Sequence, residues 1–228
     1  MKDTLMAEAA RLGLQLTSEQ TAQFCAFGEA LIEKNKVMNL TAITEPQAVA
    51  KLHFADCLAL LNMTHFHGKS VIDVGCGAGF PGVPLKIGEP SIRLTLLDSL
   101  QKRITWLTEL LPTLGVEAKC VAARAEEYGY REQFDIATSR AVARLPILAE
   151  LCLPFVKVGG CFLAMKAAAA REELEEAKRA IAVLGGKVER VVEYEIDGAE
   201  RCVLLIRKCK PTPPQYPRRF AKIKQNPL

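Results

Sequence analysis

A glycine-rich segment that directly follows a short apolar run constrains the fold more than any other feature of this chain. The run Ser70–Val74 predicts a short buried strand, and glycines follow it at positions 75, 77, 79 and 82. Glycine lets the backbone turn sharply and approach a ligand closely, and Pro81 suits the start of a helix. A strand, a glycine loop and a helix in this order predict an α/β fold with a ligand at the end of the strand.

Strands and helices alternate after this loop, which predicts a largely parallel sheet with helical crossovers. The predicted strands are Ser70–Val74, Leu94–Leu97, Cys120–Ala123, Phe134–Thr138, Gly160–Met165, Lys187–Ile196 and Arg201–Ile206. Only the turn 197–200, which begins Asp-Gly, separates the last two strands, so the last strand must run antiparallel to its neighbour. This α/β pattern, a mostly parallel seven-stranded sheet with a reversed last strand, resembles the Rossmann-like methyltransferase topology more than a dehydrogenase half.

The glycine loop matches two cofactor-binding patterns. Residues 77–82 read Gly-x-Gly-x-x-Gly, the dinucleotide pattern, with Asp98 about 20 residues further on. Residues 73–79 read Asp-x-Gly-x-Gly-x-Gly and resemble the S-adenosylmethionine (AdoMet) loop of methyltransferases. The position of the strand favours AdoMet, because a dinucleotide loop opens at the strand's end, whereas Gly77 lies three residues after Val74. A nicotinamide-dependent oxidoreductase remains the alternative.

Residues after the second and third predicted strands extend the expected cofactor site. The carboxylate of Asp98 can accept hydrogen bonds from both ribose hydroxyls, although an aspartate here can also cap the next helix. In the methyltransferase topology the loop after the third strand borders the adenine. Ala125 and Glu126 are therefore candidate adenine contacts.

Basic residues follow four of the predicted strands, at the sheet edge where ligands of parallel sheets bind. They are Lys102, Arg103, Arg124, Arg140, Arg144 and Lys166. The segment from Arg207 to Leu228 adds seven basic residues and no acidic one, so the rest of this chain of net charge +4 is mildly acidic. AdoMet is itself cationic, whereas a phosphodiester needs positive partners, so the pattern indicates a nucleic-acid substrate. Solvated surface charge is the alternative.

The chain lacks the motifs that prepare poorly nucleophilic targets for methylation. It has no Asn-Pro-Pro-Tyr or Asp-Pro-Pro-Tyr segment for exocyclic amines and no Pro-Cys pair for pyrimidine C5. A ring nitrogen such as guanine N7, which carries no proton to remove, fits better. Catalysis would then depend on positioning, with Arg140 or Lys166 holding the guanine or a flanking phosphate. His53, near Asp56, could reach the same edge, and Asn39 is interpreted as a turn or cap residue.

Composition excludes several other classes. Half of the residues are hydrophobic and a quarter are charged, so the chain can bury a core. Its eight cysteines form no Cys-x-x-Cys pair and no zinc-ligand spacing, which predicts reduced, mostly buried thiols and no metal site. No apolar run reaches the ~18 residues of a membrane span, and residues 1–16 lack a signal-peptide core. We therefore expect a cytoplasmic protein without membrane contact.

Changes in pattern divide the chain into three parts. Residues 1–65 form a predicted helical extension, with capping-box spacing at Thr17 and Gln20 and again at Thr44 and Gln47. Residues 66–209 form the predicted AdoMet-binding domain. Residues 210–228 form a basic tail whose five prolines predict extended, partly mobile chain without a regular helix.

Five ordered segments together resemble one family, from about residue 35 to the last residue. They are Asn39–Thr41, Asp73–Gly82, Leu96–Ser99, Ser139–Ala141 and Tyr216–Arg219. They look like the bacterial small-subunit ribosomal RNA methyltransferase G family, also called glucose-inhibited division protein B. Many members have Thr and Pro where this loop has Cys76 and Ala78, and we expect neither change to alter the cofactor class.

The resemblance implies an AdoMet-dependent enzyme that methylates guanine N7 in 16S ribosomal RNA near the decoding site, acting as a monomer on this RNA or on the small ribosomal subunit. Matching motif positions and the loop pattern give the expected cofactor contacts as Asp73, Gly75, Gly77, Gly79, Phe80, Asp98, Ala125, Glu126 and Arg140. The expected RNA contacts are Asn39, His53, Lys102, Arg103, Arg124, Arg144, Lys166, Arg218 and Arg219. A non-catalytic RNA-binding module on the same fold is a second alternative.

Overall fold

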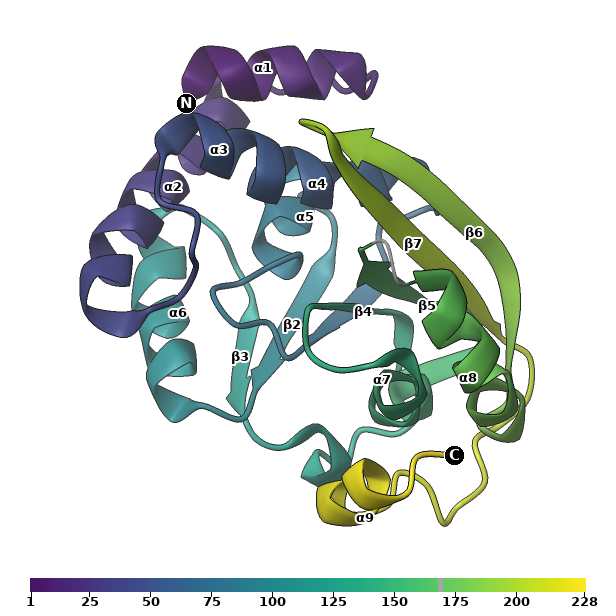
Figure 1. Ribbon diagram of the computed structural model, residues 1–228. Coiled ribbons are helices and arrows are strands. Elements are labelled where there is room, and N and C mark those ends of the chain that lie inside the picture. Colours follow the sequence, from purple (N-terminus) through teal and green to yellow (C-terminus); the bar gives the residue numbers. More distant parts are fainter. Residues whose placement is uncertain (168–169) are drawn as a thin grey trace.

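A seven-stranded sheet forms the centre of the molecule (Figure 1). The computed structural model describes residues 1–167 and 170–228. All seven predicted strands are present, with ends that differ from the prediction by up to four residues. They are β1 (Ser70–Val74), β2 (Arg93–Asp98), β3 (Lys119–Ala122), β4 (Phe134–Arg140), β5 (Val156–Lys166), β6 (Gly186–Ile196) and β7 (Ala199–Lys208).

The strand order is β3-β2-β1-β4-β5-β7-β6, and β7 runs antiparallel to both of its neighbours. The other pairings are parallel, so the predicted reversed last strand is confirmed. The sequence did not indicate that β7 inserts between β5 and β6. Positive φ angles of 52° at Asp197 and 76° at Gly198 make the tight turn that this insertion requires.

Helices surround the sheet, and the predicted helical character of the first 65 residues is confirmed. The helices are α1 (Lys2–Arg11), α2 (Ser18–Met38), α3 (Pro46–Val49), α4 (Asp56–Leu58), α5 (Gly82–Gly88), α6 (Gln101–Thr113), α7 (Leu145–Cys152), α8 (Ala170–Val183) and α9 (Phe220–Gln225). A π-helical turn, Ala50–Ala55, joins α3 to α4, and short 3-10 turns cover Ala59–Asn62, Ala125–Glu127 and Leu153–Phe155.

The capping predictions have different outcomes. The capping box of Thr17 and Gln20 is present at the start of α2. The prediction for Thr44 and Gln47 is wrong: the carboxylate of Glu45 instead accepts a hydrogen bond from the backbone N–H of Ala48, at 2.8 Å. The helix thus begins one residue later than predicted, with Glu45 as the N-cap and Pro46 as its first residue.

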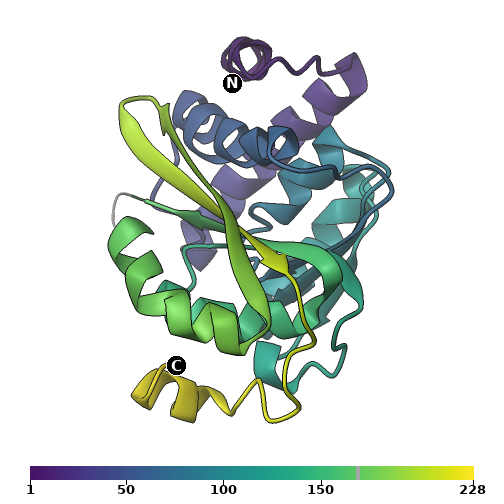
Figure 2. The same ribbon diagram turned by 90° about the vertical axis from the view of Figure 1, so that its right-hand side faces the viewer.

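The N-terminal extension and the sheet share one hydrophobic core. Phe24, Phe27 and Phe54 from the extension belong to the same buried cluster as Val83 on α5 and Leu107 on α6. A second buried cluster lies between the sheet, α7 and α8, and it includes Ile223 of the tail. The two termini lie at opposite ends of the molecule, and the β6–β7 hairpin reaches toward the N-terminal helices (Figure 2).

The prediction of a tail without a regular helix is wrong. Helix α9 forms there, and Ile223 buries its side chain completely against the second core cluster. The guanidinium of Arg131 donates hydrogen bonds to the backbone carbonyls of Thr212 and Tyr216, which fixes the chain between the prolines. The prolines exclude long regular structure but leave room for the short helix after Arg219.

Candidate functional site

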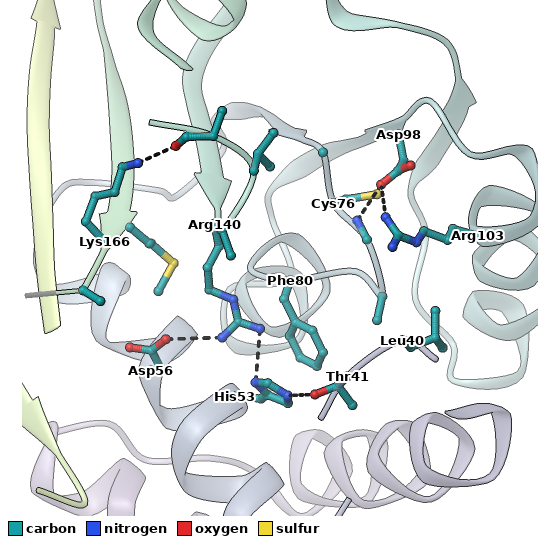
Figure 3. Close-up of a pocket in the computed structure, with 18 of the residues that line it drawn as sticks. Leu40, Thr41, His53, Asp56, Cys76, Phe80, Asp98, Arg103, Arg140 and Lys166 are labelled. Atoms are coloured by element: carbon teal, nitrogen blue, oxygen red, sulfur yellow. Dashed lines mark hydrogen bonds and ion pairs between the residues drawn. The ribbon is translucent and has the colours of Figure 1, made fainter. Parts of the chain in front are cut away.

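A cavity of about 1040 Å³ opens at the carboxyl ends of the parallel strands (Figure 3). The glycine loop after β1 and the chain segments after β2, β4 and β5 line it on the side of the sheet. Leu40 and Thr41 line it from the extension, and Tyr194 and Arg201 line it from the β6–β7 hairpin. The cavity thus lies at the edge of the sheet where the sequence predicted a ligand.

The glycines of the loop have different roles. Gly75 and Gly77 line the cavity with φ angles of 72° and 57°. Apart from its two neighbours in the chain, no described residue has an atom within 4 Å of the point where a Cβ of Gly77 would stand. Gly79 and Gly82 instead permit close packing: a Cβ on Gly79 would lie 2.7 Å from Val83 Cγ2. The Cβ position of Gly75 is filled by Val142, with Cγ2 at 2.5 Å. Of these four glycines only Gly77 therefore leaves its backbone open to a ligand, while the other three permit close packing.

Asp73 supports the glycine loop through a buried hydrogen bond and does not line the cavity. Its side chain is completely buried, and its Oδ2 accepts a hydrogen bond of 2.8 Å from the backbone N–H of Gly82. Its Oδ1 has no hydrogen-bond partner among the described residues. Burial raises the pKa of this carboxyl to about 7, against the opposing effect of the Gly82 hydrogen bond.

Asp98 does line the cavity, at the end of β2. One of its oxygens accepts from the backbone N–H of Gly77 at 2.9 Å, and the other accepts from Leu100 at 2.8 Å. The guanidinium of Arg103 lies 3.4 Å from the first of these oxygens. A carboxylate has about four acceptor positions, so one remains for a ligand hydroxyl.

An aromatic cluster forms the floor of the cavity on the side of the extension. The ring of Phe80 lies 4.7 Å from the ring of His53 and 5.3 Å from that of Phe27, centroid to centroid. The Arg140 guanidinium carbon lies 4.7 Å from the centroid of the Phe80 ring. The structure thus brings together Phe80, His53 and Arg140, which the sequence placed in three separate segments (Figure 3).

The contacts of His53 define its tautomer. Arg140 Nη2, which can only donate, lies 3.2 Å from His53 Nδ1, so the ring proton sits on Nε2 and is donated to Thr41 Oγ1 at 2.8 Å. Burial, and then the charge of Arg140, lower the pKa of His53 to about 4. At neutral pH the imidazole is therefore uncharged, and both of its nitrogens are occupied by protein partners.

The predicted ring of free cations at this edge needs correction. Four of the six line the cavity, and each of these is paired with a carboxylate, which the sequence argument did not predict. The pairs are Arg103–Asp98 at 3.4 Å, Arg140–Asp56 at 3.3 Å, Arg144–Glu176 at 2.7 Å and Lys166–Glu173 at 2.7 Å. Lys166 also donates to the backbone carbonyl of Ala143 and is only 9% exposed, so it fixes the loop after β4.

The remaining predicted contacts lie outside the cavity lining. Lys102 and Arg124 are exposed, and no ion pair to either is found among the described residues. Ala125 and Glu126 form a 3-10 turn beyond the end of β3. Asn39 adopts a left-handed conformation at the end of α2, as the cap interpretation expected.

The two arginines of the tail also lie apart from the cavity. Arg218 pairs with the completely buried carboxylate of Glu150 at 2.6 Å, and Arg219 precedes α9 with an exposed side chain. The structure therefore gives Arg218 a partner within the protein.

Sequence reasoning missed several residues that build the site. The Asn35 side chain accepts from the backbone N–H groups of Leu40 and Thr41, at 2.6 and 2.9 Å, which holds this segment at the cavity. Tyr194 and Arg201 reach the cavity from the hairpin, far along the chain from the other site residues. The role of Asn35 could have been predicted, because asparagine is common next to turns. The contacts of Tyr194 and Arg201 could not, because they depend on the order of the strands in the sheet.

The cysteines give the site no reactive thiolate. All eight cysteines are free, and burial raises the pKa of the Cys76 thiol, so this cavity-lining residue is no thiolate nucleophile. Within residues 1–167 and 170–228, no group of three or more His, Cys, Asp or Glu side chains is placed to hold a metal ion. In the same residues no helix is long and apolar enough to cross a membrane.

Comparisons with known proteins agree with this site. Residues 20–202 match the model of the GidB family, described as rRNA small subunit methyltransferase G. Proteins named ribosomal RNA small subunit methyltransferase G are 43% identical in Acetivibrio thermocellus, covering 100% of this chain and 97% of that protein, and 47% identical in a Geobacillus species, covering 95% and 94%. The structure of a SAM-dependent methyltransferase from Aquifex aeolicus, 17% identical, covers 77% of this chain and 97% of its own with a TM-score of 0.55.

The solved structure supports the fold, and the two relatives and the family match cover the glycine loop, the cavity and most of the chain. The Rossmann-like methyltransferase fold inferred from the strand pattern is confirmed, and the nicotinamide-dependent alternative is not supported. The chain belongs to the rRNA small subunit methyltransferase G family.

Proposed function

We propose that this protein transfers the methyl group of AdoMet to N7 of a guanine in 16S ribosomal RNA near the decoding site. The observation that carries the proposal is the cavity itself, in which the glycine loop and Asp98 face the aromatic cluster of Phe80, His53 and Arg140. The glycine loop and Asp98 suit the cofactor. The aromatic cluster lies where cofactor and base would meet, and its face suits a planar, electron-rich base.

The residues present fit AdoMet. The open backbone at Gly77 and the remaining acceptor position of Asp98 suit an amino-acid group and a ribose, and neither needs a phosphate partner. Gly75, Phe80 and Arg140 line the same cavity and match the cofactor positions implied by the family resemblance. Asp73 supports the cofactor from outside the cavity by fixing Gly82.

The chemistry requires positioning more than proton transfer. AdoMet, held by the glycine loop and Asp98, would supply a methyl group on a sulfonium. Its transfer to the N7 lone pair would break the S–CH3 bond and move the positive charge to the purine. No proton leaves N7, so no general base is needed. In agreement, both nitrogens of His53 are occupied, and the carboxylate of Asp56 is paired with Arg140.

Methyl transfer from radiolabelled AdoMet tests the proposal directly. The substrates are small ribosomal subunits and protein-free 16S RNA, both from cells lacking this protein, with the modified base identified after digestion. We expect label in 7-methylguanosine, and calorimetric binding of AdoMet but not of NAD. No label in either substrate despite AdoMet binding would contradict the proposed target and favour a non-catalytic RNA-binding role.

The salt dependence of RNA binding tests which cations contact the substrate. Removing the tail after Cys209 is unsuitable, because Thr212 and Arg218 are built into the fold. Charge removal at the exposed Arg219, Lys222 and Lys224 avoids this problem. If all three contact phosphates, the slope of log K against log salt becomes shallower by about 2. An unchanged slope in filter-binding titrations would exclude the tail, and Lys102 with Arg124 would be tested next.

A further inference from the structure

The orientation of Arg140 is set by contacts from the protein. Arg140 is the last residue of β4, and its guanidinium lies over the face of Phe80. One terminal nitrogen donates to Leu52 O and Asp56 Oδ2, at 3.4 and 3.3 Å, and the other meets His53 Nδ1. A guanidinium has five N–H donors. Two of them, one on Nε, therefore have no partner among the described residues, on a side chain that lines the cavity.

Asp56 is the carboxylate that balances this cation. It is only 3% exposed, and its Oδ1, the oxygen that does not meet Arg140, accepts from the hydroxyl of Tyr194 at 2.9 Å. Arg201 Nε lies 3.7 Å from that same oxygen. Burial and the Asp56 charge both raise the pKa of Tyr194, so its hydroxyl keeps the proton that it donates.

Three separate parts of the fold meet at Asp56. It follows the π-helical turn of the N-terminal extension, Arg140 comes from the sheet, and Tyr194 comes from the β6–β7 hairpin. The hairpin makes a second ion pair with the extension, between Lys51 and Asp197 at 2.6 Å, which does not involve Asp56. The two contacts join the same elements, but only one of them reaches Arg140.

We propose that Asp56, braced by Tyr194, is a positioning residue that fixes the Arg140 guanidinium on Phe80 with two N–H donors left for the bound reactants. Arg140 thereby contacts the cofactor or the guanine, while Asp56 acts only through Arg140. The inference rests on the proposed methyl transfer. It adds that the hairpin at the far edge of the sheet determines the geometry of the site.

The experiment compares D56N, Y194F and K51A in the full-length protein. D56N removes the charge that holds Arg140, and we expect the single-turnover rate of methyl transfer to fall about 100-fold and AdoMet affinity to weaken. Y194F removes only the brace, and we expect a smaller fall of about tenfold. K51A breaks the other hairpin contact and should leave both quantities unchanged. Because Y194F deletes a single hydroxyl, it keeps the test valid if D56N does not fold.

A ligand-free measurement separates positioning from general stabilisation. In the wild type, NMR titration should show His53 neutral at pH 7, with the proton on Nε2 and a pKa lowered to about 4. Burial lowers this pKa most, and the charges of Arg140 and Arg201 lower it further, while Asp56 holds Arg140 in place. Release of Arg140 in D56N should therefore raise the pKa of His53 part of the way toward the ordinary value. Unchanged His53 titration and transfer rate in D56N, or equal losses in Y194F and K51A, would overturn the proposal. An inactive wild type would instead contradict the proposed function.

Discussion

Replacing Asp73 with alanine is expected to weaken AdoMet binding about 100-fold, measured by calorimetry. The carboxylate does not line the cavity, so the loss would act through the loop. Without Oδ2, the buried N–H of Gly82 loses its acceptor, and the segment that presents Gly75 and Gly77 loses its support from β1. The alanine variant should keep its circular dichroism spectrum while losing the cofactor.

The matched variant is D73N, whose side-chain oxygen can still accept from Gly82. We expect it to bind AdoMet with close to wild-type affinity. Equal losses in D73A and D73N would show that the negative charge itself contacts the cofactor. That result would contradict the supporting role described above.

Comparison of D73N with the wild type also tests the pH dependence of stability. Burial raises the pKa of Asp73 to about 7, so between pH 3.8 and 7 the folded protein holds a proton that the unfolded chain releases. The stability from this proton is complete below pH 3.8 and is lost as the pH rises through 7. D73N lacks this titration. Its free energy of unfolding, measured with urea, should therefore rise relative to that of the wild type between pH 5 and pH 8.5. A constant difference between the two proteins would exclude the raised pKa.

Replacing Arg218 with alanine is expected to lower the free energy of unfolding by about 3–5 kcal/mol, because it leaves a buried charge unpaired. The Glu150 side chain has no exposure to solvent, and Arg218 contacts it through its guanidinium and its backbone N–H, at 2.6–3.2 Å. For a chain of this length the melting temperature should fall on the order of 10 °C.

The neighbouring Arg219 is the control, because its side chain is exposed. R219A should melt within about a degree of the wild type, since most exposed substitutions change stability little. The double variant E150L with R218M should recover most of the loss, because it removes both charges together. If R218A melted like R219A and instead changed the salt dependence of RNA binding, Arg218 would be an RNA contact after all.

The sequence was sufficient for most of the fold because its signals were local. The glycine loop, the alternation of strands and helices and the Asp-Gly turn each specify a short segment, and the reversed strand follows from the turn alone. The position of β7 between β5 and β6 depends on packing across the whole sheet. The prediction for the tail was wrong because prolines restrict only the local backbone. Helix α9 is instead held by tertiary contacts, namely the burial of Ile223 and the hydrogen bond from Arg218 to Glu150 of α7.

The site was predicted in part for the same reason. The motif residues Gly75, Gly77, Phe80, Asp98 and Arg140 do meet at one cavity. Their partners do not follow from any motif, because the cations at the edge are balanced by carboxylates of the helices α4 and α8. The motif predicted an acidic residue, Asp73, just before the loop, but it did not predict that its side chain points away from the cavity.

Two cations late in the chain, Lys208 and Arg218, affect the order in which the fold can be completed during synthesis. Lys208 is fully enclosed and donates to the carbonyls of Leu153 and Val156, while Arg218 balances Glu150. During translation the first five strands and α7 emerge before these cations exist. The nascent chain thus holds an unmatched carboxylate on Glu150 until Arg218 emerges. We expect a chain truncated before residue 218 to be cleaved faster in limited proteolysis than the full chain.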